Sequence, residues 1–249
     1  MSQKTHGQYY TDVNMATKLV RDGYRYVRAV GNWGCNVYEP CVGEGSLLGA
    51  ALTEMEQFNR IATNQDVLFS DIDPKNVAYC EKKFPGRGLV CDVLLSDSVP
   101  KNVDWIITNP PFLGGMKISS VHGAAYKDRL VAKYGKGGTA DLCSYFLRVL
   151  AEECLSDHGV LSMICTNTIA QGDTRQFGLK HLVDNGFVIV CADTNLKWTM
   201  QGSNKAAVVV SLVHLMRQEG WNEILKRSSS VTGEFILTTD LGKKGSLQA

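Results

Sequence analysis

The tetrapeptide Asn109-Pro110-Pro111-Phe112 has the residue types needed to present a planar amino or amide nitrogen for reaction. The lone pair of such a nitrogen is delocalised, which makes it a poor nucleophile. Two acceptors, the Asn109 side-chain oxygen and the Pro110 carbonyl, could hold its hydrogens and favour the geometry that attack requires. Proline stiffens the segment, and Phe112 could stack on a flat acceptor. The motif predicts methyl transfer to a planar nitrogen, with a plain strand-to-loop turn as the alternative.

Acidic residues stand at the ends of three successive predicted strands, at Glu39, Asp71 and Asp92. An acid at the end of the second strand is placed to accept hydrogen bonds from both hydroxyls of a ribose, and we assign this role to Asp71. Asp92 is expected to accept a hydrogen bond from the exocyclic amine of an adenine. Glu39 is expected to align the backbone or the far end of the ligand, because a bare carboxylate would repel a ligand carboxylate. Each acid alone is equally consistent with a solvated loop residue, but their order favours S-adenosylmethionine.

A glycine-containing turn, Glu39-Pro40-Cys41-Val42-Gly43-Glu44-Gly45, leads from the first predicted strand into an apolar helix. Glycine at such a turn lets a ligand approach the backbone and lets the helix pack closely on the sheet. The third glycine of the dinucleotide fingerprint is missing, so the turn alone is weak evidence. Together with the strand-end acids, it predicts that Cys41, Gly43, Gly45 and Ile72 contact the cofactor.

The elements that must position these residues alternate between apolar strand-like runs and helical patterns, which predicts an α/β fold with a mainly parallel sheet and helices on both faces. The short connection from Asp193 to Lys205 suits a terminal antiparallel hairpin. We therefore expect a Rossmann-like, seven-stranded class I methyltransferase sheet. The expected strands are Asn36–Pro40, Asp66–Asp71, Leu89–Asp92, Val103–Thr108, Val160–Thr166, Phe187–Ala192 and Ala206–His214, and the expected helices are Asp12–Val30, Ser46–Gln57, Pro74–Phe84, Ala140–Ser156 and Asp173–Asn185.

The segment Leu113–Gly138 follows the tetrapeptide and contains six glycines, five Lys or Arg residues and one acid. We expect it to be a long, irregular, basic loop. A loop of this length beside a predicted active site is more often functional than a simple connector, although a disordered surface loop is the alternative.

Composition places the 249-residue chain among globular proteins, with 44% apolar and 20% charged residues. No run approaches the roughly 18 apolar residues of a membrane span. The eight cysteines are scattered without a Cys-x-x-Cys pair, which favours reduced structural thiols, a cytoplasmic location and no metal site. The formal net charge of +1 neither requires nor excludes a nucleic-acid partner.

Taken in order, these motifs resemble the DNA adenine-N6 methyltransferases in which the cofactor motif precedes the catalytic motif. The chain is similar to the methylase portion of restriction–modification polypeptides over most of residues 6–215. The resemblance also rests on Gly7-Gln8-Tyr9-Tyr10-Thr11, although Asp12 stands where the family usually has proline. It implies that Tyr10 and Thr11 close over the methionine end of the cofactor.

The resemblance further implies that the target adenine is flipped out of double-stranded DNA into a pocket. Asn109 and Pro110 would hold its N6, Phe112 would stack on its ring, and the methyl group would pass directly to the nitrogen. Trp198 would cover the other face of the base, with packing on the sheet edge as an equally favoured alternative. Pro111 and Lys117 are assigned to the substrate side, where Lys117 could equally be a solvated surface residue.

The domain organisation predicted is a catalytic domain over residues 1–215, of which 1–11 close over the cofactor. Residues 216–249 would be an extension or the start of a missing target-recognition region, which could instead lie on a partner subunit. Two alternatives to DNA adenine remain open. One is methylation of a protein glutamine amide or of guanine N2 in ribosomal RNA. The other is a non-catalytic cofactor-binding subunit, which the intact tetrapeptide disfavours.

Overall fold

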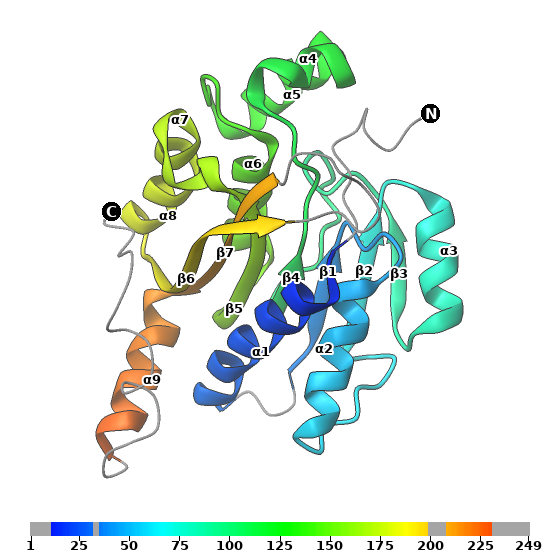
Figure 1. Cartoon of the computed structure of the whole chain (residues 1–249), viewed down its shortest axis with the longest axis vertical. Coiled ribbons are helices and arrows are strands. Elements are labelled where there is room, and N and C mark those ends of the chain that lie inside the picture. Colours follow the sequence, from blue (N-terminus) through cyan, green and yellow to red (C-terminus); the bar gives the residue numbers. More distant parts are fainter. Residues whose placement is uncertain (1–10, 32–34, 199–207, 231–249) are drawn as a thin grey trace.

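The computed structural model describes residues 11–31, 35–198 and 208–230. Their strands form one seven-stranded sheet in the order β3-β2-β1-β4-β5-β7-β6 (Figure 1). The first five strands are parallel, and β7 runs antiparallel to both β5 and β6. The predicted fold class is therefore confirmed. The strands are β1 (Val37–Pro40), β2 (Val67–Asp71), β3 (Arg87–Val90), β4 (Val103–Thr108), β5 (Leu155–Thr166), β6 (Phe187–Trp198) and β7 (Val208–Arg217).

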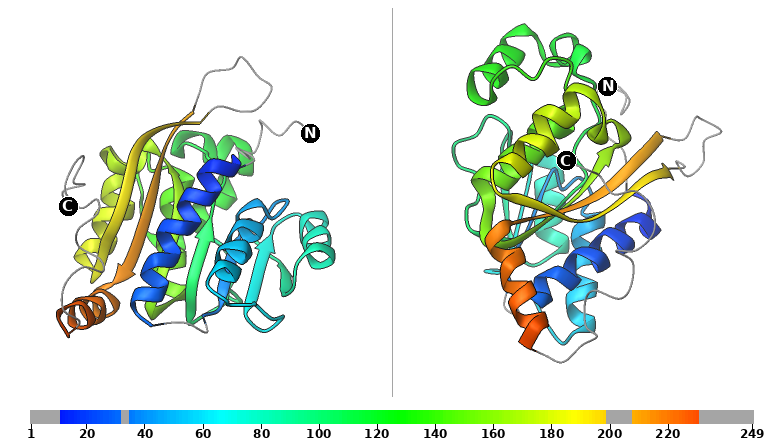
Figure 2. Two further views of the ribbon diagram at one scale, coloured as in Figure 1. Left: turned by 60° about the horizontal axis from the view of Figure 1, so that its bottom comes forward. Right: turned by 90° about the vertical axis from the view of Figure 1, so that its left-hand side faces the viewer.

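Helices cover both faces of this sheet (Figure 2). One face packs against α1 (Val13–Ala29), α2 (Ser46–Gln57) and α3 (Pro74–Lys83). The other packs against α6 and the helical elements that precede β6. These elements are α6 (Leu142–Val149), the π-helical turn Leu150–Cys154, the 3-10 turn Asn167–Ala170, α7 (Gly172–Arg175), the π-helical turn Gln176–Lys180 and α8 (His181–Asp184).

Strand β4 shows why the apolar runs are continuous rather than alternating. Successive side chains of a strand point to opposite faces, so Trp105 and Ile107 enter one core cluster while Ile106 enters the other. All three side chains are fully buried. A central parallel strand covered by helices on both faces is rich in apolar residues, and the last residue of β4, Thr108, is fully buried.

The prediction of an irregular loop over Leu113–Gly138 is wrong. This segment contains α4 (Gly115–His122) and α5 (Ala124–Tyr134). Several of its glycines lie at helix ends: Gly123 and Gly135 have φ of +91° and +85° with extended ψ, a conformation that is essentially restricted to glycine. The apolar face of α5 is buried in the core through Leu130 and Tyr134. Tertiary packing therefore stabilises helices that the glycine content of the segment did not predict.

Four strands have limits that differ from the predictions by two residues or more: β3, β5, β6 and β7, of which β7 ends at Arg217 and not at His214. The helix predicted over Ala140–Ser156 also ends earlier, since β5 begins at Leu155. Strand β3 begins and ends two residues early, because it lies at the sheet edge, is largely exposed and lacks a clear apolar pattern. Strand β5 begins at Leu155, which pairs with Val103. Strand β6 continues to Trp198, so this residue ends a strand and does not belong to the predicted connection.

Strand β7 leads directly into α9 (Gln218–Ser230), whose Ile224 is buried against the cluster on the α1 face. The proposed boundary between residues 215 and 216 stays a prediction. Within the described ranges, every helix is too short or too polar to cross a membrane.

A buried chain of polar side chains connects strands β4, β5 and β7 beneath α1. Trp105 Nε1 donates a hydrogen bond to Ser162 Oγ at 3.3 Å, and Ser162 Oγ lies 2.9 Å from His214 Nδ1. Helix α1 approaches so closely that a Cβ at Gly23 would lie 2.2 Å from Ser162 Oγ. Burial lowers the pKa of His214 from its ordinary 6.5 to about 4, so the imidazole is neutral in the folded protein at neutral pH.

This pKa predicts acid sensitivity of the fold. Because the unfolded state takes up the His214 proton first, the stability that His214 contributes is complete above about pH 6.5 and is lost as the pH falls toward 4. Lowering the pH from 6.5 to 5 should cost the wild type roughly 2 kcal/mol more than it costs His214→Gln. Urea unfolding at both pH values measures this difference. The exposed control His158→Gln should follow the wild type, and equal slopes for wild type and His214→Gln would contradict the prediction.

Candidate active site

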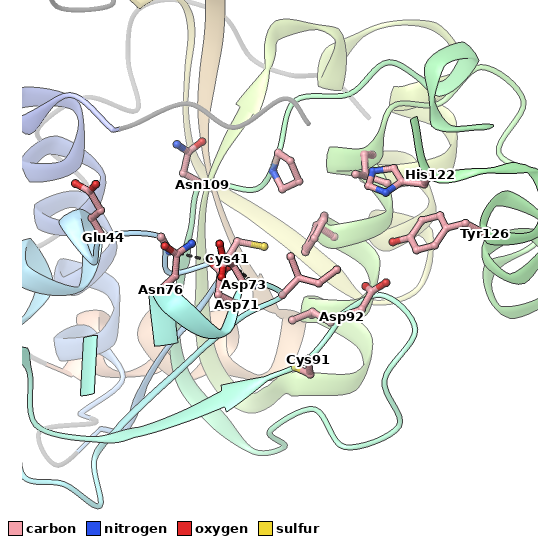
Figure 3. Close-up of a pocket in the computed structure, with 16 residues that line it drawn as sticks. Cys41, Glu44, Asp71, Asp73, Asn76, Cys91, Asp92, Asn109, His122 and Tyr126 are labelled. Atoms are coloured by element: carbon pink, nitrogen blue, oxygen red, sulfur yellow. Dashed lines mark hydrogen bonds between the residues drawn. The ribbon is translucent and has the colours of Figure 1, made fainter. Parts of the chain in front are cut away.

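A cavity of about 510 Å³ opens at the carboxyl edge of the sheet (Figure 3). Its volume lies within the range of small-molecule sites, about 300–1,000 Å³. Its walls come from the segments that follow β1, β2, β3 and β4, and from α3, α4, α5 and α6. The lining residues are Cys41, Gly43, Glu44, Asp71, Ile72, Asp73, Asn76, Cys91, Asp92, Val93, Asn109, Pro111, His122, Tyr126, Leu142 and Phe146.

The Asp71 carboxylate joins the first two loops of the cavity. Its Oδ2 accepts a hydrogen bond from the backbone N–H of Gly43 at 2.9 Å, and its Oδ1 accepts one from Asp73 at 2.9 Å. The residue is only 5% exposed. Each carboxylate oxygen has two lone pairs, so the same group that fixes the loops can also accept hydroxyls from a ligand in the cavity.

Glu39 shapes the site from behind the cavity wall. Its side chain is buried, and Oε2 accepts a hydrogen bond from the backbone N–H of Leu48 in the first turn of α2 at 2.7 Å. Burial raises the pKa of Glu39 well above its ordinary value, although the Leu48 hydrogen bond acts in the opposite direction. The predicted role in aligning backbone fits this position. Because the protein's own carboxyl group occupies the start of α2, that helix end is not available to a phosphate.

Gly45, like Thr11, is a predicted cofactor residue that lies outside the cavity lining. It precedes α2 with φ +74°, and a Cβ there would lie 2.3 Å from Phe84 Cε2. Gly43 also has positive φ, +52°, but a Cβ there would meet nothing within 4 Å. Glycine at position 45 therefore permits close helix packing, whereas glycine at position 43 leaves open space beside the cavity.

The lining residues suit a nucleoside that carries a positive charge. Four of them are acidic: Glu44, Asp71, Asp73 and Asp92. The lining contains no Lys or Arg from the part of the chain that the structure describes, so a pyrophosphate would lack a counter-charge here, whereas a sulfonium would be attracted. Ile72, Val93 and Phe146 supply apolar walls for a flat base.

Asn109 brings the tetrapeptide to the cavity directly after β4. Its Nδ2 donates a hydrogen bond to Thr11 Oγ1 at 3.1 Å, which connects the start of the described chain to this loop. Asn109 and Pro111 both line the cavity, while Pro110 is buried. Tyr10 lies outside the described residues, so its predicted cofactor contact stays a prediction.

The residues assigned to the substrate side are only partly brought together. Phe112 and Trp198 pack edge to face, with ring centroids 5.7 Å apart and an interplanar angle of 87°. Trp198 is 3% exposed and is a core residue in this conformation. Neither ring lines the cavity, and Lys117 lies exposed on α4. Roles for Phe112, Trp198 and Lys117 in substrate binding stay predictions.

Sequence reasoning missed a group of lining residues that come from helices. Phe146 and Leu142 belong to α6, and Asn76 belongs to α3. His122 and Tyr126 come from the segment predicted to be a loop, and their rings stack with centroids 4.8 Å apart. The available signal was the i, i+4, i+8 spacing of Tyr126, Leu130 and Tyr134, which is typical of one helix face.

Comparison with known proteins identifies relatives of this arrangement. The family described as the MmeI DNA-methyltransferase domain matches residues 89–226, more than half of the chain. DNA methyltransferase A of Bacillus subtilis (strain 168) is 27% identical over 112 residues, which are 44% of this chain and 12% of that protein. The chain thus spans about an eighth of the length of this relative.

Two solved structures share the fold. The type I restriction-modification system methyltransferase subunit from Streptococcus thermophilus superposes with a TM-score of 0.64 at 15% identity, covering 85% of this chain and 45% of that one. The type IIL restriction-modification enzyme MmeI in complex with DNA gives a TM-score of 0.61 at 17% identity, covering 82% of this chain and 33% of that one.

The contrast between Gly43 and Gly45 predicts that alanine at position 45 mainly lowers stability, whereas alanine at position 43 mainly lowers cofactor affinity. Alanine at either position costs about 1 kcal/mol of left-handed strain, but only the Gly45→Ala methyl meets Phe84. Gly45→Ala should therefore lower the free energy of unfolding more than Gly43→Ala. Gly43→Ala should lower affinity for S-adenosylmethionine about tenfold, because its methyl would occupy space that the cofactor approaches. Urea unfolding and calorimetric titration measure the two effects, and wild-type affinity in Gly43→Ala would refute the close approach.

Asp71→Ala should weaken binding of S-adenosylmethionine by about 1.5–3 kcal/mol, the scale of hydrogen bonding to a charged group. The variant removes the predicted ribose acceptor and also the acceptor that fixes Gly43 and Asp73. Calorimetric titration at neutral pH measures the loss. Asp97→Ala, at an exposed position outside the cavity lining, is the control. Unchanged affinity in Asp71→Ala would rule out the ribose assignment.

Proposed function

The chain belongs to the family of MmeI DNA-methyltransferase domains, with S-adenosylmethionine as cofactor, and we propose that it methylates the N6 of adenine in DNA. The predicted resemblance to restriction–modification methyltransferases is confirmed at the level of the family. The observation that carries the finer proposal is the position of Asn109. It begins the Asn-Pro-Pro-Phe segment, lines the nucleoside cavity and is hydrogen bonded to Thr11.

The chemistry of the proposed reaction is mainly alignment. When bound, S-adenosylmethionine supplies a methyl group that its sulfonium makes electrophilic. The amide oxygen of Asn109 and the carbonyl of Pro110 accept the two N6 hydrogens, which turns the nitrogen lone pair toward the methyl. The nitrogen would take the methyl group, and the electron pair of the carbon–sulfur bond would remain with the sulfur. The surplus N6 proton leaves afterwards, so proximity and orientation supply most of the acceleration.

The proposed substrate is double-stranded DNA with the target adenine flipped out, because N6 is paired and stacked inside the duplex. Phe112 is proposed to stack on the extrahelical base. The edge-to-face packing of Phe112 on Trp198 supports this proposal, because it restrains the Phe112 ring directly after the Asn109–Pro111 segment. We further propose that sequence recognition comes from a domain or subunit outside residues 11–230. A cytoplasmic location stays a prediction from composition.

Mass spectrometry of nucleosides from the nucleic acids and of peptides from the protein tests the proposal and separates it from its alternatives. The chain is incubated with S-adenosylmethionine and, in turn, unmethylated duplex DNA, ribosomal RNA and release-factor protein. We expect N6-methyladenine in DNA. A DNA duplex with adenines opposite abasic sites belongs in the same series, because an unpaired base costs less to flip and reduces dependence on a recognition domain. N2-methylguanine in RNA or methylated glutamine in protein would overturn the DNA proposal.

Asn109→Ala should abolish methyl transfer while leaving affinity for S-adenosylmethionine nearly unchanged, because the side chain is proposed to hold the substrate nitrogen. Product is measured by mass spectrometry and affinity by calorimetry. Asn222→Ala, on the exposed side of α9, is the control and should retain both. Parallel loss of product and cofactor affinity in Asn109→Ala would mean that Asn109 supports the cavity and does not act on the substrate.

A further inference from the structure

Helix α5 is attached to the loop that carries Asp92. Tyr126, Leu130 and Tyr134 are spaced by four residues and therefore share one face of α5. Tyr134 Oη donates a hydrogen bond to the backbone carbonyl of Leu94 at 2.6 Å. Leu130, which lies one helical turn from each tyrosine, is fully buried. The Leu94 N–H in turn donates to Asp92 Oδ1 at 3.0 Å. The helix and the Asp92 loop thus form one connected unit.

The opposite end of this helix face lies in the cavity wall. Tyr126 and Asp92 both line the cavity, and Figure 3 shows them on one side of it with the Tyr126 hydroxyl directed inward. The ring of His122 stacks on that of Tyr126, with centroids 4.8 Å apart and planes inclined by 27°. His122 also lines the cavity. The stack restrains the Tyr126 ring from the side of α4.

The Tyr126 hydroxyl is suited to act as a donor. Burial, and then the negative charge of the nearby Asp92 carboxylate, raises the pKa of Tyr126. The phenol therefore keeps its proton at neutral pH. A hydroxyl on the same side of a cavity as a carboxylate can donate to one carboxylate oxygen, and this favours one rotation of the group and one direction for its remaining lone pairs.

We propose that Tyr126 is a positioning residue that sets the base specificity of the cofactor site. Its hydroxyl orients the Asp92 carboxylate so that this group accepts a hydrogen bond from the exocyclic amine of the cofactor adenine. His122 holds the Tyr126 ring in place. This inference rests on the proposed contact between Asp92 and the adenine amine. It does not depend on which substrate is methylated.

The consequence is selection for an amino group at position 6 of the cofactor base. A site built to accept a hydrogen bond from an amine rejects the analogue that lacks the amine, because the acceptor, here the half-buried Asp92, is then left without that donor. In hypoxanthine a carbonyl oxygen replaces the amine. A correctly oriented Asp92 carboxylate would face this oxygen and repel it.

Calorimetric titration of the 249-residue chain with S-adenosylhomocysteine and S-inosylhomocysteine tests the inference. The wild type should prefer the adenosyl compound. Tyr126→Phe keeps the ring and its stack on His122 but removes the hydroxyl. It should lower affinity for the adenosyl compound about tenfold, the scale of one hydrogen bond to a charged group. Affinity for the inosyl compound should change little, so the preference falls by the same factor. Tyr79→Phe, at a half-exposed position on α3, should behave as the wild type.

Other outcomes overturn distinct parts of the inference. Equal losses for both compounds in Tyr126→Phe would show that Tyr126 only packs against the cavity. Unchanged preference in Tyr126→Phe, with preference lost in Asp92→Ala, would reject the positioning role alone. Unchanged preference in Asp92→Ala would reject the adenine contact on which the inference rests. Failure of methyl transfer to DNA adenine appears only in the product assay, so it is distinguishable from all three.

Discussion

The active-site edge of this domain depends on one carboxylate. Asp71 ends β2 and accepts hydrogen bonds from Gly43, which follows β1, and from Asp73, which leads into α3. A single carboxylate thereby binds two loops that follow adjacent parallel strands. Both loops contribute to the cavity wall. A buried carboxylate without such donors would be costly, so the loops stabilise the acid while the acid fixes the loops.

The electrostatic character of the cavity follows from the same arrangement. Glu39 occupies the first turn of α2 through Leu48, so the helix end that binds phosphate in dinucleotide-binding folds is blocked by the protein itself. The remaining charges in the described lining are carboxylates. This combination disfavours anionic cofactors and favours a nucleoside with a sulfonium. The Gly-x-Gly turn therefore serves a different ligand here from the one that its resemblance to the dinucleotide fingerprint would indicate.

The segment between the tetrapeptide and α6 completes the site. Because α4 and α5 fold over the end of the cavity near Asp92, they add His122 and Tyr126 to a wall otherwise made by strand ends and by α3 and α6. Tyr134 fastens α5 to the Asp92 loop. The same segment follows directly from Asn109–Phe112, so the helices that close the cofactor end are covalently continuous with the proposed catalytic loop. A short, packed helical pair thus joins the proposed catalytic loop to the cavity wall near Asp92.

The sequence by itself determined the sheet, its terminal antiparallel pair and the strand-end residues that meet at one edge. Apolar periodicity is local, and parallel strands place their carboxyl ends together, so Asp71, Asp92 and Asn109 were predictable as neighbours. Only the tertiary structure decided that Glu39 faces Leu48 rather than the cavity, that Trp198 packs on Phe112, and that residues 115–122 and 124–134 are helical. The physical reason is that these outcomes depend on contacts between segments distant in the chain, where burial of residues such as Leu130 outweighs the local preference of glycine-rich sequence for loops.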